Sequence, residues 1–143
     1  MRSPWLVGAL TAALGCGAGP MVEAPLPAPD RASFEATVGD VLARRCGAAS
    51  CHGAAGRPFA LFAAHQRRLP PTTTFDQAPL TPAELDANYA ATRGFLNAES
   101  ALETLLVRKA LGQAAHGGGP VFEHRSDPEC RALRAWIEGR SLP

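Results

Sequence analysis

The sequence predicts an all-α fold for the chain from about residue 31 onward. Apolar residues recur there at helical spacing, whereas no alternating or β-branched run is long enough to form a strand. Thr81 and Ser100 are each followed three residues later by Glu, the pattern of a helix-initiating capping box. The length of 143 residues, with 46% hydrophobic and 19% charged residues, suits one small folded domain.

Residues 1–15 have the pattern of a secretory signal peptide. Arg2 supplies a positive charge, and the apolar stretch between Trp5 and Leu14 is too short to cross a bilayer. The segment ends in the residues ALGC, which resemble the lipobox of bacterial lipoproteins and imply that Cys16 is lipidated. An ordinary signal peptide with an incidental cysteine is the alternative. We therefore expect an exported lipoprotein of the cell envelope, anchored to a membrane and facing the periplasm or the cell exterior.

Residues 16–30 contain four prolines, which predict an extended tether between the membrane and the folded part. Export places the cysteines that follow in an oxidising compartment. The charges of the whole chain nearly cancel, with 14 Lys and Arg residues against 13 Asp and Glu residues. Because this balance provides no basic surface for phosphate groups, we exclude nucleic acid as a partner.

The first helix is expected behind Ser33, which is placed to cap it. Val38, Leu42 and Cys46 follow one another at four-residue intervals, so the cysteine should face inward. The next stretch is ambiguous and contains at most one short helix, around residues 61–68.

A middle helix is expected to open at Thr81, with Pro82 in its first turn and Gly94 at its end. Leu80 and Leu85 are spaced to form a hydrophobic staple across its start.

Two further helices complete the expected fold. One is capped by Ser100, stops near Gly112 and points three leucines to the core: Leu102, Leu105 and Leu106. The last begins at Asp127 and Pro128, ends at Gly139 and has an inward face made by Cys130, Leu133 and Ile137.

The residues that carry chemistry directly follow the first helix, where the chain from Cys46 to His52 reads CGAASCH. Covalent attachment of a c-type haem needs two thiols for the vinyl groups and a His directly after the second thiol to bind the iron. Four residues separate Cys46 from Cys51 here, instead of the usual two. The alternatives are a disulfide between the two cysteines and a structural zinc site.

A six-coordinate haem needs a second axial ligand, which is Met in most cytochromes c. Both methionines of the chain precede residue 31, which leaves Lys109, three histidines or an open iron. His116 is the best placed, because it opens a loop of three glycines that let the backbone approach a flat ring. Alternatively, His116 is an exposed loop residue. We expect His65 to pack in the core and His124 to lie on the surface.

The layout of a first helix running into the haem motif, with a last helix that carries Leu133, Trp136 and Ile137, resembles a class I cytochrome c domain. The closing half, from the LLVRKALG run through the His116 loop to Gly139, is similar to planctomycete-type cytochrome c domains. The resemblance covers residues 31–143 and implies an all-α domain in which the N- and C-terminal helices cross. It also implies that Cys46, Cys51 and His52 hold haem c.

The expected function is that of an exported, lipid-anchored monohaem cytochrome that passes single electrons to an unidentified redox protein. We find no catalytic motif, although an open iron could reduce peroxide. The alternative is a haem-free helical lipoprotein, stapled by a disulfide, that serves as a binding or envelope-structural module. Cys130 is either a packed core thiol or the disulfide partner of Cys46 or Cys51.

Overall fold

The computed structural model describes residues 29–72, 76–96 and 100–140. Over these ranges the chain is helical and has no β-strand, which confirms the all-α prediction. The expected signal peptide, Cys16 and most of the tether lie outside the described residues. No helix within the described ranges is long and apolar enough to cross a membrane.

The elements are α1 (Arg31–Ser33), the π-helical segment η1 (Phe34–Val38), α2 (Gly39–Cys46), α3 (Pro82–Arg93), the 3₁₀ turn η2 (Ala101–Glu103), α4 (Leu105–Ala110) and α5 (Pro128–Ile137).

The elements α1, η1 and α2 follow one another without a break and form one N-terminal helix, residues 31–46. Its N-cap is Asp30, not Ser33: the Asp30 carboxylate accepts a hydrogen bond of 2.6 Å from the backbone amide of Ser33. Asp30 has the extended backbone that a cap requires, whereas Ser33 is already helical. The inward face is as predicted, and Cys46 at its end is buried.

The capping box at Thr81 is confirmed. The Glu84 amide donates to the Thr81 hydroxyl at 3.3 Å, and the Thr81 amide donates to the Glu84 carboxylate at 2.8 Å. Pro82 lies in the first turn, and the helix ends directly before Gly94, as predicted.

The third predicted helix was placed wrongly at its start. Ser100 makes no capping bond, and α4 is instead capped by Thr104, whose hydroxyl accepts from the Val107 amide at 3.4 Å. The extended backbone at Thr104 separates α4 from the short turn η2. As a result Leu105 is 37% exposed, in contrast to the prediction that it points to the core.

The expected short helix at residues 61–68 is also wrong, because this stretch consists of turns and irregular backbone. Two side chains of α3 bind it instead. Asn88 accepts from the Phe62 amide at 2.7 Å and donates to the Phe62 carbonyl at 2.9 Å. Arg68 donates to the Glu84 carboxylate at 2.9 Å, and both side chains are almost completely buried. The Glu84 carboxylate also accepts from the Leu69 amide at 2.8 Å, so Asn88 and Glu84 satisfy backbone groups that a helix would have satisfied internally.

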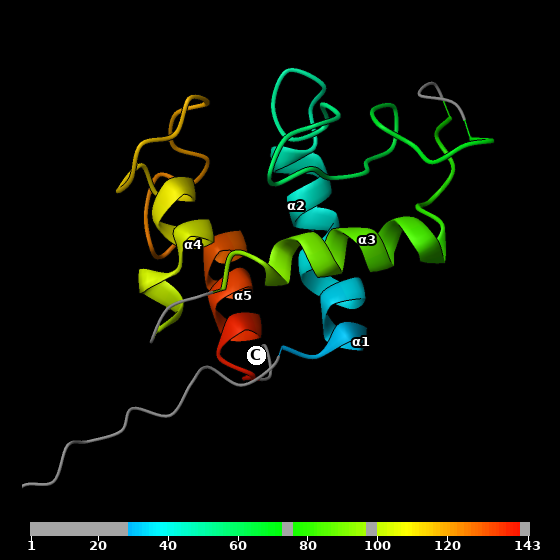
Figure 1. The fold of residues 1–143 in the computed structure, drawn as a ribbon. Helices are drawn as coiled ribbons and strands as arrows, with labels where there is room; N and C mark the ends of the chain where they lie inside the picture. Colours follow the sequence, from blue (N-terminus) through cyan, green and yellow to red (C-terminus); the bar gives the residue numbers. More distant parts are fainter. Residues whose placement is uncertain (1–28, 73–75, 97–99, 141–143) are drawn as a thin grey trace, which may run out of the picture.

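The N-terminal helix and α5 pack together, as predicted. Near the start of the N-terminal helix, the rings of Phe34 and Trp136 lie 5.3 Å apart. Near its end, Arg44 and Arg45 both pair with Glu129. Asp127 caps α5, and its three predicted inward residues are buried. Figure 1 shows that α3 crosses the N-terminal helix and that α4 and α5 lie next to each other on one side of the N-terminal helix.

Candidate functional site

The candidate site begins where α2 ends, in a tight turn that we call the motif turn, residues 46–53. The His52 amide donates to the carbonyl of Cys46 at 3.1 Å, and the Gly53 amide donates to the carbonyl of Ala48 at 2.9 Å. A Cβ atom at Gly53 would collide with the carbonyl oxygen of Gly47, so the turn closes only with glycine there. The four residues between the cysteines are therefore folded into a compact turn that returns His52 to the end of the helix.

His52 is held by the stretch that follows the motif turn. Its Nδ1 lies 2.7 Å from the carbonyl oxygen of Phe59, and its own carbonyl accepts from the Leu61 amide at 2.7 Å. Since a carbonyl oxygen can only accept, Nδ1 carries the proton and Nε2 presents its lone pair. Burial lowers the pKa of His52, and the Phe59 contact opposes this only in part. The ring is therefore held neutral, the form that binds metals.

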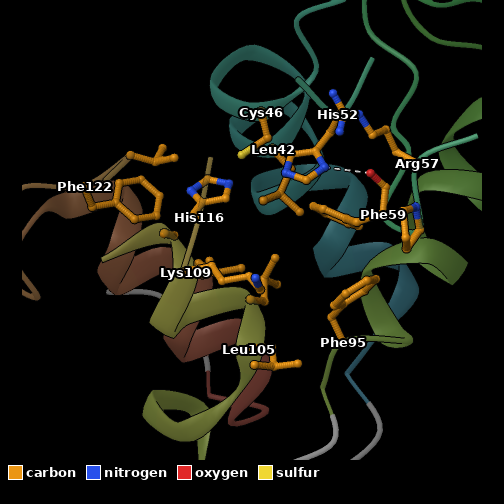
Figure 2. A pocket seen from close by; sticks show the side chains of 15 residues that line it. Leu42, Cys46, His52, Arg57, Phe59, Phe95, Leu105, Lys109, His116 and Phe122 are labelled. Carbon is orange, nitrogen blue, oxygen red and sulfur yellow. Dashed lines mark hydrogen bonds between the residues drawn. The ribbon is translucent and has the colours of Figure 1, made fainter. Parts of the chain in front are cut away.

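His116 is held in the same way from the other side. Its Nδ1 lies 2.7 Å from the carbonyl oxygen of Gly119, so Nδ1 carries a proton and Nε2 is the ring nitrogen that remains to bind a metal. The ring centroids of His52 and His116 are 5.8 Å apart and the ring planes are inclined by only 11°. Figure 2 shows the two imidazoles facing one another, one from the motif turn and one from the loop after α4.

This pair of rings fits a single metal ion held between them. Two metal–imidazole bonds of about 2 Å, placed end to end, bring the ring centroids roughly 6 Å apart. Metal-binding histidines also typically donate their other ring N–H to a backbone carbonyl or carboxylate, which fixes the tautomer and the ring orientation. Both His52 and His116 meet this condition.

The space around the two rings is large and mostly apolar. A cavity of about 220 Å³ lies beside them, and Figure 2 shows its lining side chains. Apolar residues form most of that lining: Leu42, Pro58, Phe59, Phe95, Leu105, Leu106, Ala110, Val121, Phe122 and Leu133. A second cavity of about 470 Å³ shares both histidines and Cys46 with the first. A flat apolar cofactor with a central metal matches this combination of walls and facing imidazoles.

The two motif cysteines border these cavities. Cys46 lines both of them and Cys51 lines the second. Burial raises the pKa of Cys46 to about 11, with a smaller contribution from Cys51, so Cys46 is a neutral thiol at pH 7. The three cysteines among the described residues, including Cys130, are all free.

The other candidate ligands lie elsewhere or are already engaged. His65 is exposed in a turn with a φ of 58°, so the expectation that it packs on a helix in the core was wrong. His124 is exposed, as predicted. Lys109 lines the first cavity, but its ammonium donates to the carbonyl of Ala115 at 2.6 Å. Within the described ranges, no three or more His, Cys, Asp or Glu side chains form a metal-binding cluster of the kind that a zinc site needs.

Sequence reasoning missed the groups that orient the two rings. The carbonyls of Phe59 and Gly119 are backbone atoms and carry no residue signature. Asn88, which fixes the stretch beyond Phe59, lies far from it in the sequence and carries no signal of that contact. Arg57 lines both cavities and had a signal that went unused, namely a cation four residues after the motif turn.

Comparisons with known proteins give no further information about this site. Comparisons of the chain with protein-family models, with curated proteins and with solved structures found no match.

Proposed function

We propose that the chain is a c-type cytochrome that binds one haem covalently and transfers single electrons to or from a redox protein. The observation that carries this proposal is the pair of facing imidazoles, each with Nδ1 bonded to a backbone carbonyl, beside an apolar cavity that a CxxxxCH motif borders. A motif alone is compatible with a disulfide. The opposed second histidine, 64 positions further along the chain, is what favours haem.

The thiols of Cys46 and Cys51 would each add across a vinyl group, with sulfur bonding one vinyl carbon and the hydrogen going to the other. His52 and His116 would hold the iron through their Nε2 atoms. The haem supplies the one-electron change of the iron. The guanidinium of Arg57, at the edge of both cavities, is placed to pair with a propionate.

The protein side chains would set the properties of that haem. The carbonyl of Phe59 increases the basicity of His52, and the apolar walls exclude water from the ring. A second His in place of Met gives a lower reduction potential than that of ordinary cytochromes c. The reduced protein should therefore give up its electron readily.

Haem staining tests this proposal. The full chain, produced with a c-type maturation system, should keep a haem-positive band after denaturation, and Cys51→Ala should lose or weaken it. Cys130→Ala is the matched control, because Cys130 is buried in α5 and borders neither cavity. An unstained band from exported, folded protein would favour the haem-free module instead.

The proposal includes anchoring to a membrane of the cell envelope through a lipid on Cys16, with residues 16–30 as the tether. Fractionation tests this part separately. The wild-type protein should sediment with membranes, and Cys16→Ser should release it. A Cys16→Ser protein that still sediments with membranes would contradict the anchor without affecting the haem site.

A further inference from the structure

The loop that carries His116 is held at its ends and at one point in its middle. We call residues 111–120 the distal loop. At its start the Gln113 amide donates to the carbonyl of Arg108 at 2.8 Å, and just beyond its end the Val121 amide donates to the carbonyl of Ala110 at 2.8 Å. Between these points, the Lys109 ammonium donates to the carbonyl of Ala115, next to His116.

The middle of the distal loop has little packing of its own. Ala115, Gly117 and Gly118 are exposed. A Cβ atom built at Gly117 or at Gly119 would meet no atom within 4 Å. The bond between His116 and Gly119 lies within the loop and cannot tie it to the rest of the protein. The Lys109 contact is therefore the bond that fixes the middle of the loop to α4.

We infer that Lys109 is a positioning residue for His116, and that the iron face on this side accepts a small external donor when the Lys109 contact opens. This inference rests on the proposed haem. The donors concerned are small groups with a free lone pair, such as imidazole or cyanide. On the His52 side, the closed motif turn leaves no comparable freedom.

The exchange needs no oxidant and no proton transfer at Lys109. The ammonium moves from the Ala115 carbonyl to water and keeps its charge, while that carbonyl is hydrated. In the haem-loaded protein, His116 would then move away from the iron and keep its Nε2 lone pair, and the incoming donor would supply a lone pair of its own. The loop bond from Nδ1 to Gly119 moves with the ring, so His116 keeps the tautomer that allows it to return.

The first experiment compares the binding of imidazole and of cyanide to the haem-loaded protein by absorbance. Lys109→Leu keeps an apolar side chain in the cavity and removes the ammonium without adding a group that binds iron, so the rate of ligand binding should rise about tenfold. Lys109→Arg should retain slow binding. Arg108→Leu is the matched control, because it removes a neighbouring positive charge and leaves the backbone bond from the Gln113 amide to the Arg108 carbonyl in place. Equal rates in Lys109→Leu and wild type would overturn the inference, as would an equal rise in Arg108→Leu.

Hydrogen exchange supplies a readout that does not depend on haem. The Gly119 amide, bonded to the carbonyl of His116, should exchange about tenfold faster in Lys109→Leu than in wild type. The Leu61 amide, bonded to the carbonyl of His52, should be unchanged. If the chain takes up no haem, the proposed function fails, but the exchange at Gly119 still decides whether Lys109 holds the loop. An unchanged Gly119 amide would overturn that role.

Discussion

His52 and His116 carry the same ring and the same bond from Nδ1 to a backbone carbonyl, yet the protein holds them in opposite ways. His52 lies in a turn closed by backbone bonds and by a glycine that tolerates no side chain. His116 lies in a loop whose glycines face open space. The fold therefore fixes the first of these two candidate ligands tightly and the second only loosely.

The difference extends to what lies behind each ring. The stretch that binds His52 is fixed to α3 through Asn88 at Phe62 and through Glu84 at Arg68. The distal loop is fixed to α4 through backbone hydrogen bonds and through one hydrogen bond at the surface, from the Lys109 ammonium to the carbonyl of Ala115. Changes behind His52 should therefore reduce the stability of the whole domain, while changes around His116 should alter ligation and leave the fold intact. The loss in the free energy of unfolding should therefore be largest for variants behind His52 and smallest for variants at His116.

The largest effect is expected for Glu84→Gln, which leaves the buried guanidinium of Arg68 without its counter-charge. Breaking one partner of a buried ion pair costs about 3–5 kcal/mol. Urea unfolding measures this loss. Asp86→Asn is the matched control on the same helix, since Asp86 pairs with Arg31 at the surface and should contribute less than about 1 kcal/mol. Similar losses in the two variants would mean that the buried pair does not hold the His52 side.

A pair of glycine substitutions compares the two regions directly. Gly53→Ala forces a Cβ into the carbonyl of Gly47 and should cost at least about 2 kcal/mol, because backbone atoms on both sides must move. Gly117→Ala meets open space and should change stability by less than about 1 kcal/mol. Thermal unfolding of both variants checks this. Equal losses would show that the distal loop is as tightly constrained as the motif turn.

Acid should weaken the His52 side through Glu84. Burial by itself raises the pKa of Glu84, but hydrogen bonds from Arg68 and from the amides of Leu69 and Thr81 outweigh it and lower the pKa to about 2. The ordinary value is 4.5, so the ionised carboxylate contributes stability above about pH 4.5 and this contribution is lost as the pH falls toward 2. The unfolding free energies of wild type and Glu84→Gln should therefore converge over that range. Parallel curves would contradict the assignment.

The sequence predicted the features that depend on neighbours along the chain. The capping box at Thr81 and the start of the last helix at Asp127 both depend on a side chain and nearby amides, and both predictions were correct. Ser100 and Thr104 both have the extended backbone that a cap needs, but only the Thr104 side chain accepts a capping bond, from the Val107 amide, and α4 begins behind it. The pattern of the sequence does not decide between two such competitors.

What the sequence could not provide is the contact between distant segments. Residues 61–68 resemble a short helix until the side chain of Asn88 satisfies the backbone of Phe62, which no local pattern reveals. His116 was selected because the domain lacks Met and because of the glycines that follow it. The orientation of the two rings depends on the backbone carbonyls of Phe59 and Gly119. Because every residue has a backbone carbonyl, the sequence does not reveal which ones bind the histidines.

The smallest effect on stability is expected for His116→Ala, together with the clearest spectral change. His116 is half-buried in a loop with open space around it, so the free energy of unfolding of the haem-loaded protein should fall by less than about 1 kcal/mol beyond the lost ligand bond. The iron should change from low-spin to high-spin and bind added imidazole, because the motif turn keeps His52 in place. His124→Ala and His65→Ala remove exposed histidines and should leave the spectrum unchanged. If His116→Ala stayed low-spin without added ligand, the Lys109 amine, after losing a proton, would be the group that replaces it, since this side chain already lies at the same loop and its stem lines the same cavity. The double variant with Lys109→Leu would then become high-spin.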